Sequence, residues 1–157
     1  MEQMTMQFSE WTRVAEVELV YKTKVKASER PLANSSSKCY QLLLQTWDEN
    51  KIDFIEQFKV LLLNRSNRVL GILELSTGGI TGTVADTRLV MMAALKANAV
   101  AVILSHNHPS GNLKPSRQDE ELTRKIKTAG MYLDIQVLDH VIVTSEGYYS
   151  FADEGVM

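Results

Sequence analysis

A run of six apolar residues, Ala-Val-Ala-Val-Ile-Leu at positions 99–104, constrains the fold of this chain more than any other feature. A run of this length is typical of a strand that is buried on both faces. It is far shorter than the ~18 residues that a membrane-spanning helix needs. Amphipathic helix patterns lie on both sides of it, over residues 86–97, where Asp86 is the expected cap, and over residues 117–129. A buried strand between two helices indicates an α/β fold.

The rest of the chain fits the same fold class. The predicted strands cover residues 14–26, 58–63, 68–75, 135–143 and 148–151. The second and third of these are separated by a short polar turn, which predicts a β-hairpin. Residues 38–47 have the apolar spacing of a helix, residues 76–83 are expected to form a glycine-rich loop, and Gly130 is expected to end the helix before residue 135. We therefore expect a mixed β-sheet flanked by helices.

Composition narrows the class of protein. A length of 157 residues with 45% hydrophobic residues fits one globular domain. A formal net charge of −2 gives no support for broad binding to nucleic acid or to an acidic membrane. The single cysteine, Cys39, cannot form an intramolecular disulfide, and the first residues contain no apolar signal segment. We expect a cytoplasmic protein without membrane association, and the sequence does not define its oligomeric state.

Three candidate metal ligands, His106, His108 and Asp119, lie within fourteen residues. At a strand end, residues two apart point to the same side, so the two imidazoles can hold one metal ion. Asp119 lies at the start of the next helix, whose N-terminus favours an ionised carboxylate by ~0.3–1 kcal/mol. Two nitrogens and one oxygen suit Zn²⁺, and three protein ligands leave a fourth position for water, as in catalytic sites. Water bound to zinc can ionise near pH ~7 and attack a carbonyl carbon.

The same residues also have structural interpretations. Two histidines in a loop that contains prolines can form a surface turn. Ser116 and Asp119 fit the S-x-x-D pattern of a capping box, which does not exclude a second role for either residue. His140 is expected in a strand as a packing or hydrogen-bonding residue, and Asn107 suits either the site or a turn. From the residues alone, both the metal site and the turn stay open.

A longer pattern resembles a known family. The string His106-Asn107-His108-Pro109-Ser110-Gly111, followed by Pro115-Ser116 and Asp119, looks like the JAMM signature H-x-H-x7-S-x2-D, and in particular like the bacterial RadC family. The resemblance extends over roughly residues 35–155. It implies a single MPN (cytidine-deaminase-like) domain over residues 35–157, preceded by an accessory N-terminal segment of strand and loop over residues 1–34. It also implies one Zn²⁺ per chain, held by His106, His108 and Asp119.

The resemblance further implies catalytic roles. JAMM enzymes use an upstream glutamate as the general base, and in RadC-like chains it lies in an E-x-F sequence before an apolar strand. Here that sequence is Glu56-Gln57-Phe58, which makes Glu56 the candidate base. Ser116 matches the signature serine, which helps to stabilise an oxyanion. The implied function is a zinc-dependent hydrolase, a peptidase or isopeptidase-like enzyme, that attacks an amide of a peptide or protein substrate with zinc-bound water.

There are two alternative functions. One is a RadC-like, non-enzymatic interaction domain associated with DNA repair or recombination, which the family name suggests. Full-length RadC proteins commonly carry an N-terminal helix-hairpin-helix region, and the first ~35 residues here are too few for such a domain. The other is a nucleotide deaminase, which needs H-x-E with P-C-x-x-C. Both of those motifs are absent, as is the H-E-x-x-H motif of zincins.

Overall fold

The computed structural model describes residues 15–18, 22–78 and 85–157 of the chain. Its helical elements are η1 (Ala27–Glu29), α2 (Ser36–Thr46), α3 (Glu49–Ile52), α4 (Thr87–Lys96) and α5 (Arg117–Tyr132). Its strands are β1 (Gln57–Leu63), β2 (Val69–Thr77), β3 (Ala101–Asn107), β4 (Gln136–Val143) and β5 (Tyr148–Ser150). Within these ranges, every helix is too short or too polar to cross a membrane.

The strands form one mixed sheet in the order β2-β1-β3-β4-β5. β1 and β2 form the predicted antiparallel hairpin, and β1 also pairs antiparallel with β3. β3 and β4 are parallel and are connected through α5, whereas β5 returns antiparallel to β4. The α/β class and the mixed sheet flanked by helices are therefore confirmed.

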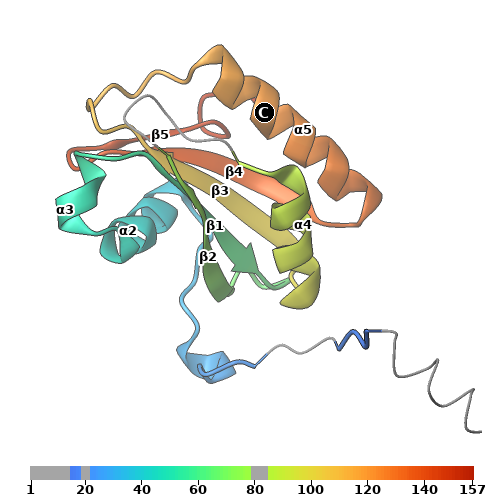
Figure 1. The fold of residues 1–157 in the computed structure, drawn as a ribbon. Helices are drawn as coiled ribbons and strands as arrows, with labels where there is room; N and C mark the ends of the chain where they lie inside the picture. Colours follow the sequence, from blue (N-terminus) through green and yellow to red (C-terminus); the bar gives the residue numbers. More distant parts are fainter. Residues whose placement is uncertain (1–14, 19–21, 79–84) are drawn as a thin grey trace, which may run out of the picture.

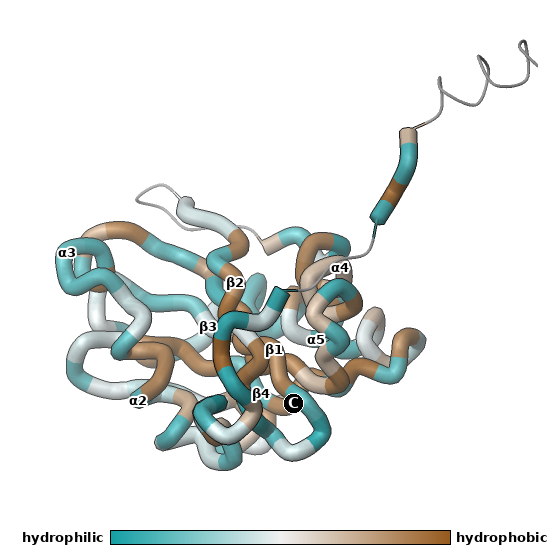
Figure 2. The backbone as a smooth tube through the Cα atoms, turned by 90° about the horizontal axis from the view of Figure 1, so that it is seen from below, coloured by the Kyte–Doolittle hydropathy of each residue, from teal (hydrophilic) through white to brown (hydrophobic). Residues whose placement is uncertain are grey.

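Helices cover both faces of the sheet, as Figure 1 shows. On one face, α4 and α5 pack against β1 and β3 around Val60, Leu104 and Ile126. On the other face, α2 packs against the same strands around Leu43 and Ile103. Every residue of β1 and β3 is buried, which explains their nearly continuous apolar sequences. Figure 2 shows hydrophobic segments gathered in the central strands and hydrophilic segments in the surrounding loops.

Side-chain caps define where the main helices begin. Ser35 accepts a hydrogen bond from the N–H of Lys38 at the start of α2, and Asp86 accepts one from the N–H of Arg88 at the start of α4. Ser116 and Asp119 form the predicted capping box at the start of α5. These short-range signals placed all three helix starts within two residues of the sequence prediction.

Several details differ from the sequence prediction. The strand predicted over residues 14–26 is wrong for the part that the structure describes, because residues 15–18 and 22–26 are exposed and form no strand. An alternating pattern becomes a strand only where a sheet edge pairs with it, and in the described part of the segment before α2 the one such contact is the bridge between Leu32 and Arg68. Residues 49–52 form a short helix that was not predicted, and β3 continues three residues past Leu104. Of the predicted loop 76–83, residues 79–83 lie outside the described residues.

Gly130 does not end α5, which continues to Tyr132. The Gly130 carbonyl accepts hydrogen bonds from the N–H groups of Leu133 and Ile135, so the chain turns tightly over the helix end into β4. Asp134 supplies the left-handed conformation of this turn, with φ of 55°. A Cβ atom on Gly130 would overlap the Ile135 carbonyl oxygen. Glycine is needed here for close approach rather than for a left-handed conformation.

We expect Gly130→Ala to destabilise the protein. In an ordinary helix interior this change gains up to ~1 kcal/mol. Here the added methyl group meets backbone that cannot move away, and overpacking of that kind costs ~1–3 kcal/mol. Urea unfolding measures the difference, and Gly71→Ala is the control, because a Cβ there meets nothing within 4 Å. A Gly130→Ala protein that is as stable as the control would contradict the close approach.

Candidate metal centre

Strand pairing brings Glu56 and the two histidines to one face of the sheet. Phe58 of β1 lies opposite His106 of β3 in the antiparallel register. Side chains alternate between faces along an extended chain, so Glu56, just before β1, and His108, just after β3, point to the same face as that pair. One ligand atom from each of Glu56, His106 and His108 lies within 4.8 Å of the other two. These three residues are therefore close enough to bind one metal ion.

Asp119 reaches the same point from the start of α5. Its Oδ2 lies 3.4 Å from Nε2 of His106 and 3.6 Å from Nε2 of His108. The two Nε2 atoms lie 2.9 Å from each other. Around a tetrahedral Zn²⁺ with bonds of about 2.0–2.2 Å, neighbouring ligand atoms lie roughly 3.3 Å apart. The triangle formed by these three atoms thus has the size of one face of a zinc coordination sphere.

The capping box and the contact with the histidines use the same carboxylate. Asp119 Oδ2 accepts a hydrogen bond from the Ser116 N–H at 2.8 Å, and the Asp119 N–H donates to Ser116 Oγ at 3.0 Å. Burial alone raises the pKa of Asp119, but the two neighbouring imidazoles and the Ser116 N–H stabilise the charged carboxylate and outweigh burial. The pKa of Asp119 therefore lies well below its usual range. Asp119 can therefore cap α5 and face a cation at the same time.

A chain of hydrogen bonds fixes the tautomer of His106. The Thr123 hydroxyl has one proton, which it donates to the Asp119 carbonyl at 2.7 Å. Thr123 Oγ1 must therefore accept from Nδ1–H of His140 at 2.6 Å. Full burial holds the pKa of His140 well below its usual value, so its Nε2 carries a lone pair and accepts from Nδ1–H of His106 at 2.7 Å. Nε2 of a neutral His106 is then an acceptor, and it faces the site.

His108 is held in the same tautomer by a simpler contact. Its Nδ1 lies 2.6 Å from the Asn112 carbonyl oxygen, which can only accept, so this nitrogen carries the proton. In these tautomers, three acceptor atoms, two imidazole Nε2 and one carboxylate oxygen, converge on one point. Burial alone lowers the pKa of His108, but the neighbouring Asp119 carboxylate and the Asn112 carbonyl raise it overall. A Zn²⁺ ion satisfies all three acceptors at once, so the donor set fits this metal.

We expect His140→Phe and Thr123→Val to lower the affinity for Zn²⁺ by about 10–100-fold, the usual cost of losing a group that orients a metal-binding histidine. Each change removes one link of the chain that fixes His106 and keeps the side-chain volume similar. Competition with a coloured chelator measures the affinity. Both variants binding zinc as tightly as the unchanged protein would contradict the assigned tautomer.

The structure brings the predicted metal ligands together, and two further groups lie behind them. Ser116 caps α5 beside Asp119, and Glu56 lies within reach of both histidines. His140 lies in β4 and contacts His106 and Thr123, as expected of a hydrogen-bonding residue in a strand, whereas Thr123 was not predicted. A histidine inside an otherwise apolar strand was the available signal for His140, because buried imidazoles need specific partners. Thr123 offered no comparable signal.

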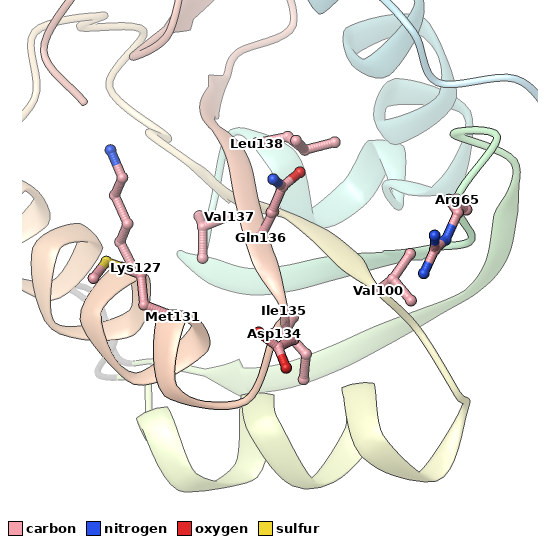
Figure 3. Close-up of a pocket in the computed structure, with 9 residues that line it drawn as sticks. All are labelled: Arg65, Val100, Lys127, Met131, Asp134, Ile135, Gln136, Val137 and Leu138. Atoms are coloured by element: carbon pink, nitrogen blue, oxygen red, sulfur yellow. The ribbon is translucent and has the colours of Figure 1, made fainter.

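One hollow lies away from this centre. It has a volume of about 740 Å³ and is bordered by Arg65, Lys127 and the first residues of β4, as Figure 3 shows. Gln136 and Val100 lie at the starts of β4 and β3, whereas the histidines lie at the far end of β3. At ~3.3 Å per residue, seven strand residues separate the two places by about 20 Å. The hollow has no part in the metal centre.

The fold and this cluster define a class of protein, a JAB-type (MPN) domain, and that class includes metallohydrolases. The family described as "RadC-like JAB domain" matches residues 33–156. The match covers most of the chain, which therefore belongs to this family. The division at residues 34 and 35 between an accessory segment and the domain stays a prediction.

Curated proteins are also similar in sequence to part of the chain. A UPF0758 protein of Flavobacterium johnsoniae is 54% identical over 101 residues, which are 64% of this chain and 44% of the relative. A UPF0758 protein of Porphyromonas gingivalis is 46% identical over 103 residues, 65% of this chain and 45% of the relative. The chain thus matches less than half the length of these relatives, and their names state no activity.

Proposed function

We propose that this chain is a zinc-dependent hydrolase of the JAMM type, a peptidase or isopeptidase-like domain that cleaves an amide bond. The observation that carries the proposal is the convergence of three acceptor atoms from His106, His108 and Asp119, with the Glu56 carboxylate beside them. An ion held by two nitrogens and one oxygen keeps a coordination position open for reactants, which is the arrangement of catalytic rather than structural zinc.

Each residue has a defined task in this proposal. When bound, Zn²⁺ supplies a Lewis acid that polarises a carbonyl and lowers the pKa of water to about 7. Glu56 takes the proton from the attacking water and delivers it to the nitrogen of the leaving amine. Because the Ser116 Oγ accepts the Asp119 N–H, its own O–H proton is free to be donated to the oxyanion that develops on the carbonyl oxygen.

Hydrolysis that depends on the metal centre is the direct test. The chain loaded with one equivalent of Zn²⁺ is incubated with a library of internally quenched peptides and with an isopeptide-linked lysine conjugate. We expect cleavage that stops when a chelator removes zinc and returns when zinc is added back, and none with Asp119→Asn. Cleavage that survives chelation would contradict the proposal. Stable capture of a protein partner by the zinc-loaded chain without hydrolysis would favour an interaction domain instead.

A further inference from the structure

The side chain of Asn107 works on the face of the sheet opposite to the metal centre. Asn107 is fully buried and lies between the two histidines in sequence. Since His106 and His108 point to the α5 face, Asn107 points to the other face, toward α3. There its carboxamide contacts the backbone of the segment that leads into β1.

Three hydrogen bonds connect the Asn107 carboxamide to that segment. Its Nδ2 donates to the carbonyl of Ile52 at 2.8 Å and to the carbonyl of Ile55 at 2.9 Å. Its Oδ1 accepts from the N–H of Gln57 at 2.7 Å. Both donors and the oxygen of the carboxamide are therefore used, and the last two bonds fall on the residues immediately before and after Glu56.

The hydrogen bonds of Asn107 connect β3 to the chain before β1 beyond the last paired residues of these two strands. The paired residues of β1 and β3 run from Leu63 opposite Ala101 to Phe58 opposite His106, and Glu56 lies beyond them. On its other side, the Glu56 carbonyl accepts from the Gly78 N–H at 2.9 Å, next to the end of β2. The backbone around Glu56 is thus fixed from β2 through Gly78 and from β3 through Asn107.

We propose that Asn107 is a positioning residue that holds Glu56 at the correct distance from the metal ligands. The inference rests on the proposed function, in which Glu56 is the general base. A base must lie within hydrogen-bond reach of the proton that it takes, and a displacement of 1 Å can cost ~100-fold in rate. Asparagine is suited to this role because a short carboxamide supplies two donors and an acceptor together, whereas aspartate supplies only acceptors.

The test compares Asn107→Asp with Asn107→Leu on an internally quenched peptide that the unchanged chain cleaves. The first variant keeps the shape of the side chain and the oxygen that accepts from Gln57, and it carries the test if the second does not fold. Ser105→Ala is the matched control, because the buried Ser105 hydroxyl also bonds β3 to the β1 backbone, through the Lys59 carbonyl at 2.9 Å. Its bond lies away from Glu56.

We expect both Asn107 variants to lower kcat by about 10–100-fold. The Zn²⁺ affinity of both variants should change by less than about twofold. When either change is combined with Glu56→Gln, kcat should fall by no more than about twofold below that of Glu56→Gln alone. Ser105→Ala should keep kcat near that of the unchanged chain. An undiminished kcat in Asn107→Asp, or an equal loss with and without Glu56, would overturn the positioning role. A Glu56→Gln chain with normal kcat would instead contradict the proposed function itself.

Discussion

Replacing His108 by alanine is expected to lower the affinity of the chain for Zn²⁺ by more than about 100-fold. Loss of a group that orients a ligand already costs ~10–100-fold, and loss of the ligand itself also removes a bond to the ion. The change should leave the fold intact, since His108 is only half-buried and belongs to neither apolar cluster. Equilibrium competition with a coloured chelator measures the affinity, and circular dichroism checks the fold.

Lys114→Ala is the control for the His108 variant. Lys114 is exposed and lies in the same loop, so its loss should leave zinc binding unchanged. His106→Ala is less informative, because His106 is fully buried and also bonds to His140, so its loss combines ligand removal with destabilisation. Zinc bound by His108→Ala as tightly as by the Lys114 control would mean that the converging acceptors do not hold the ion.

Replacing Glu56 by glutamine is expected to lower kcat for amide cleavage by about 10²–10⁴-fold, the usual contribution of a positioned general base. Glutamine keeps the size of the side chain but cannot accept a proton at neutral pH. Zinc affinity should stay close to that of the unchanged chain, because the three acceptor atoms that face the ion belong to other residues. Steady-state kinetics on the quenched peptide, with zinc content measured on the same sample, gives both values.

Asp119→Asn is the comparison that separates the two carboxylates. Glu56 also lies close enough to both histidines to be a metal ligand. We assign that role to Asp119, because its Oδ2 is fixed by the Ser116 N–H and lies at ligand spacing from both imidazoles. Asp119→Asn should therefore lose zinc, whereas Glu56→Gln should retain it. The opposite outcome would exchange the two roles.

Local patterns were enough to predict most of the fold. Residues 101–104 of the apolar run form the first half of β3, and the caps Asp86 and Ser116 begin α4 and α5 as predicted. The N-terminal strand failed because an alternating pattern says nothing about whether a sheet edge lies beside it. Gly130 was misplaced for a similar reason, since its requirement comes from Ile135, which only the folded chain brings to the helix.

The metal centre also has one part that the sequence predicts and another that only the structure shows. The histidines and Asp119 lie close together in sequence, so spacing alone could suggest them. Their supporting contacts are remote in sequence: His140 lies 34 positions after His106, and Asn107 lies 50 positions after Gln57. Sheet register creates these contacts, and no short motif records them. The motif therefore identifies candidate ligands, whereas the tautomers and the placement of Glu56 follow only from the structure.

The most direct measurement is a crystal structure of the zinc-loaded chain with anomalous data collected at the zinc absorption edge. We expect one anomalous peak about 2.0–2.2 Å from His106 Nε2, His108 Nε2 and Asp119 Oδ2, with one coordination position not taken by protein. The Glu56 carboxylate should lie beside that position. A map with no peak among these three atoms, or with a fourth protein ligand closing the ion, would contradict a catalytic zinc centre in this chain.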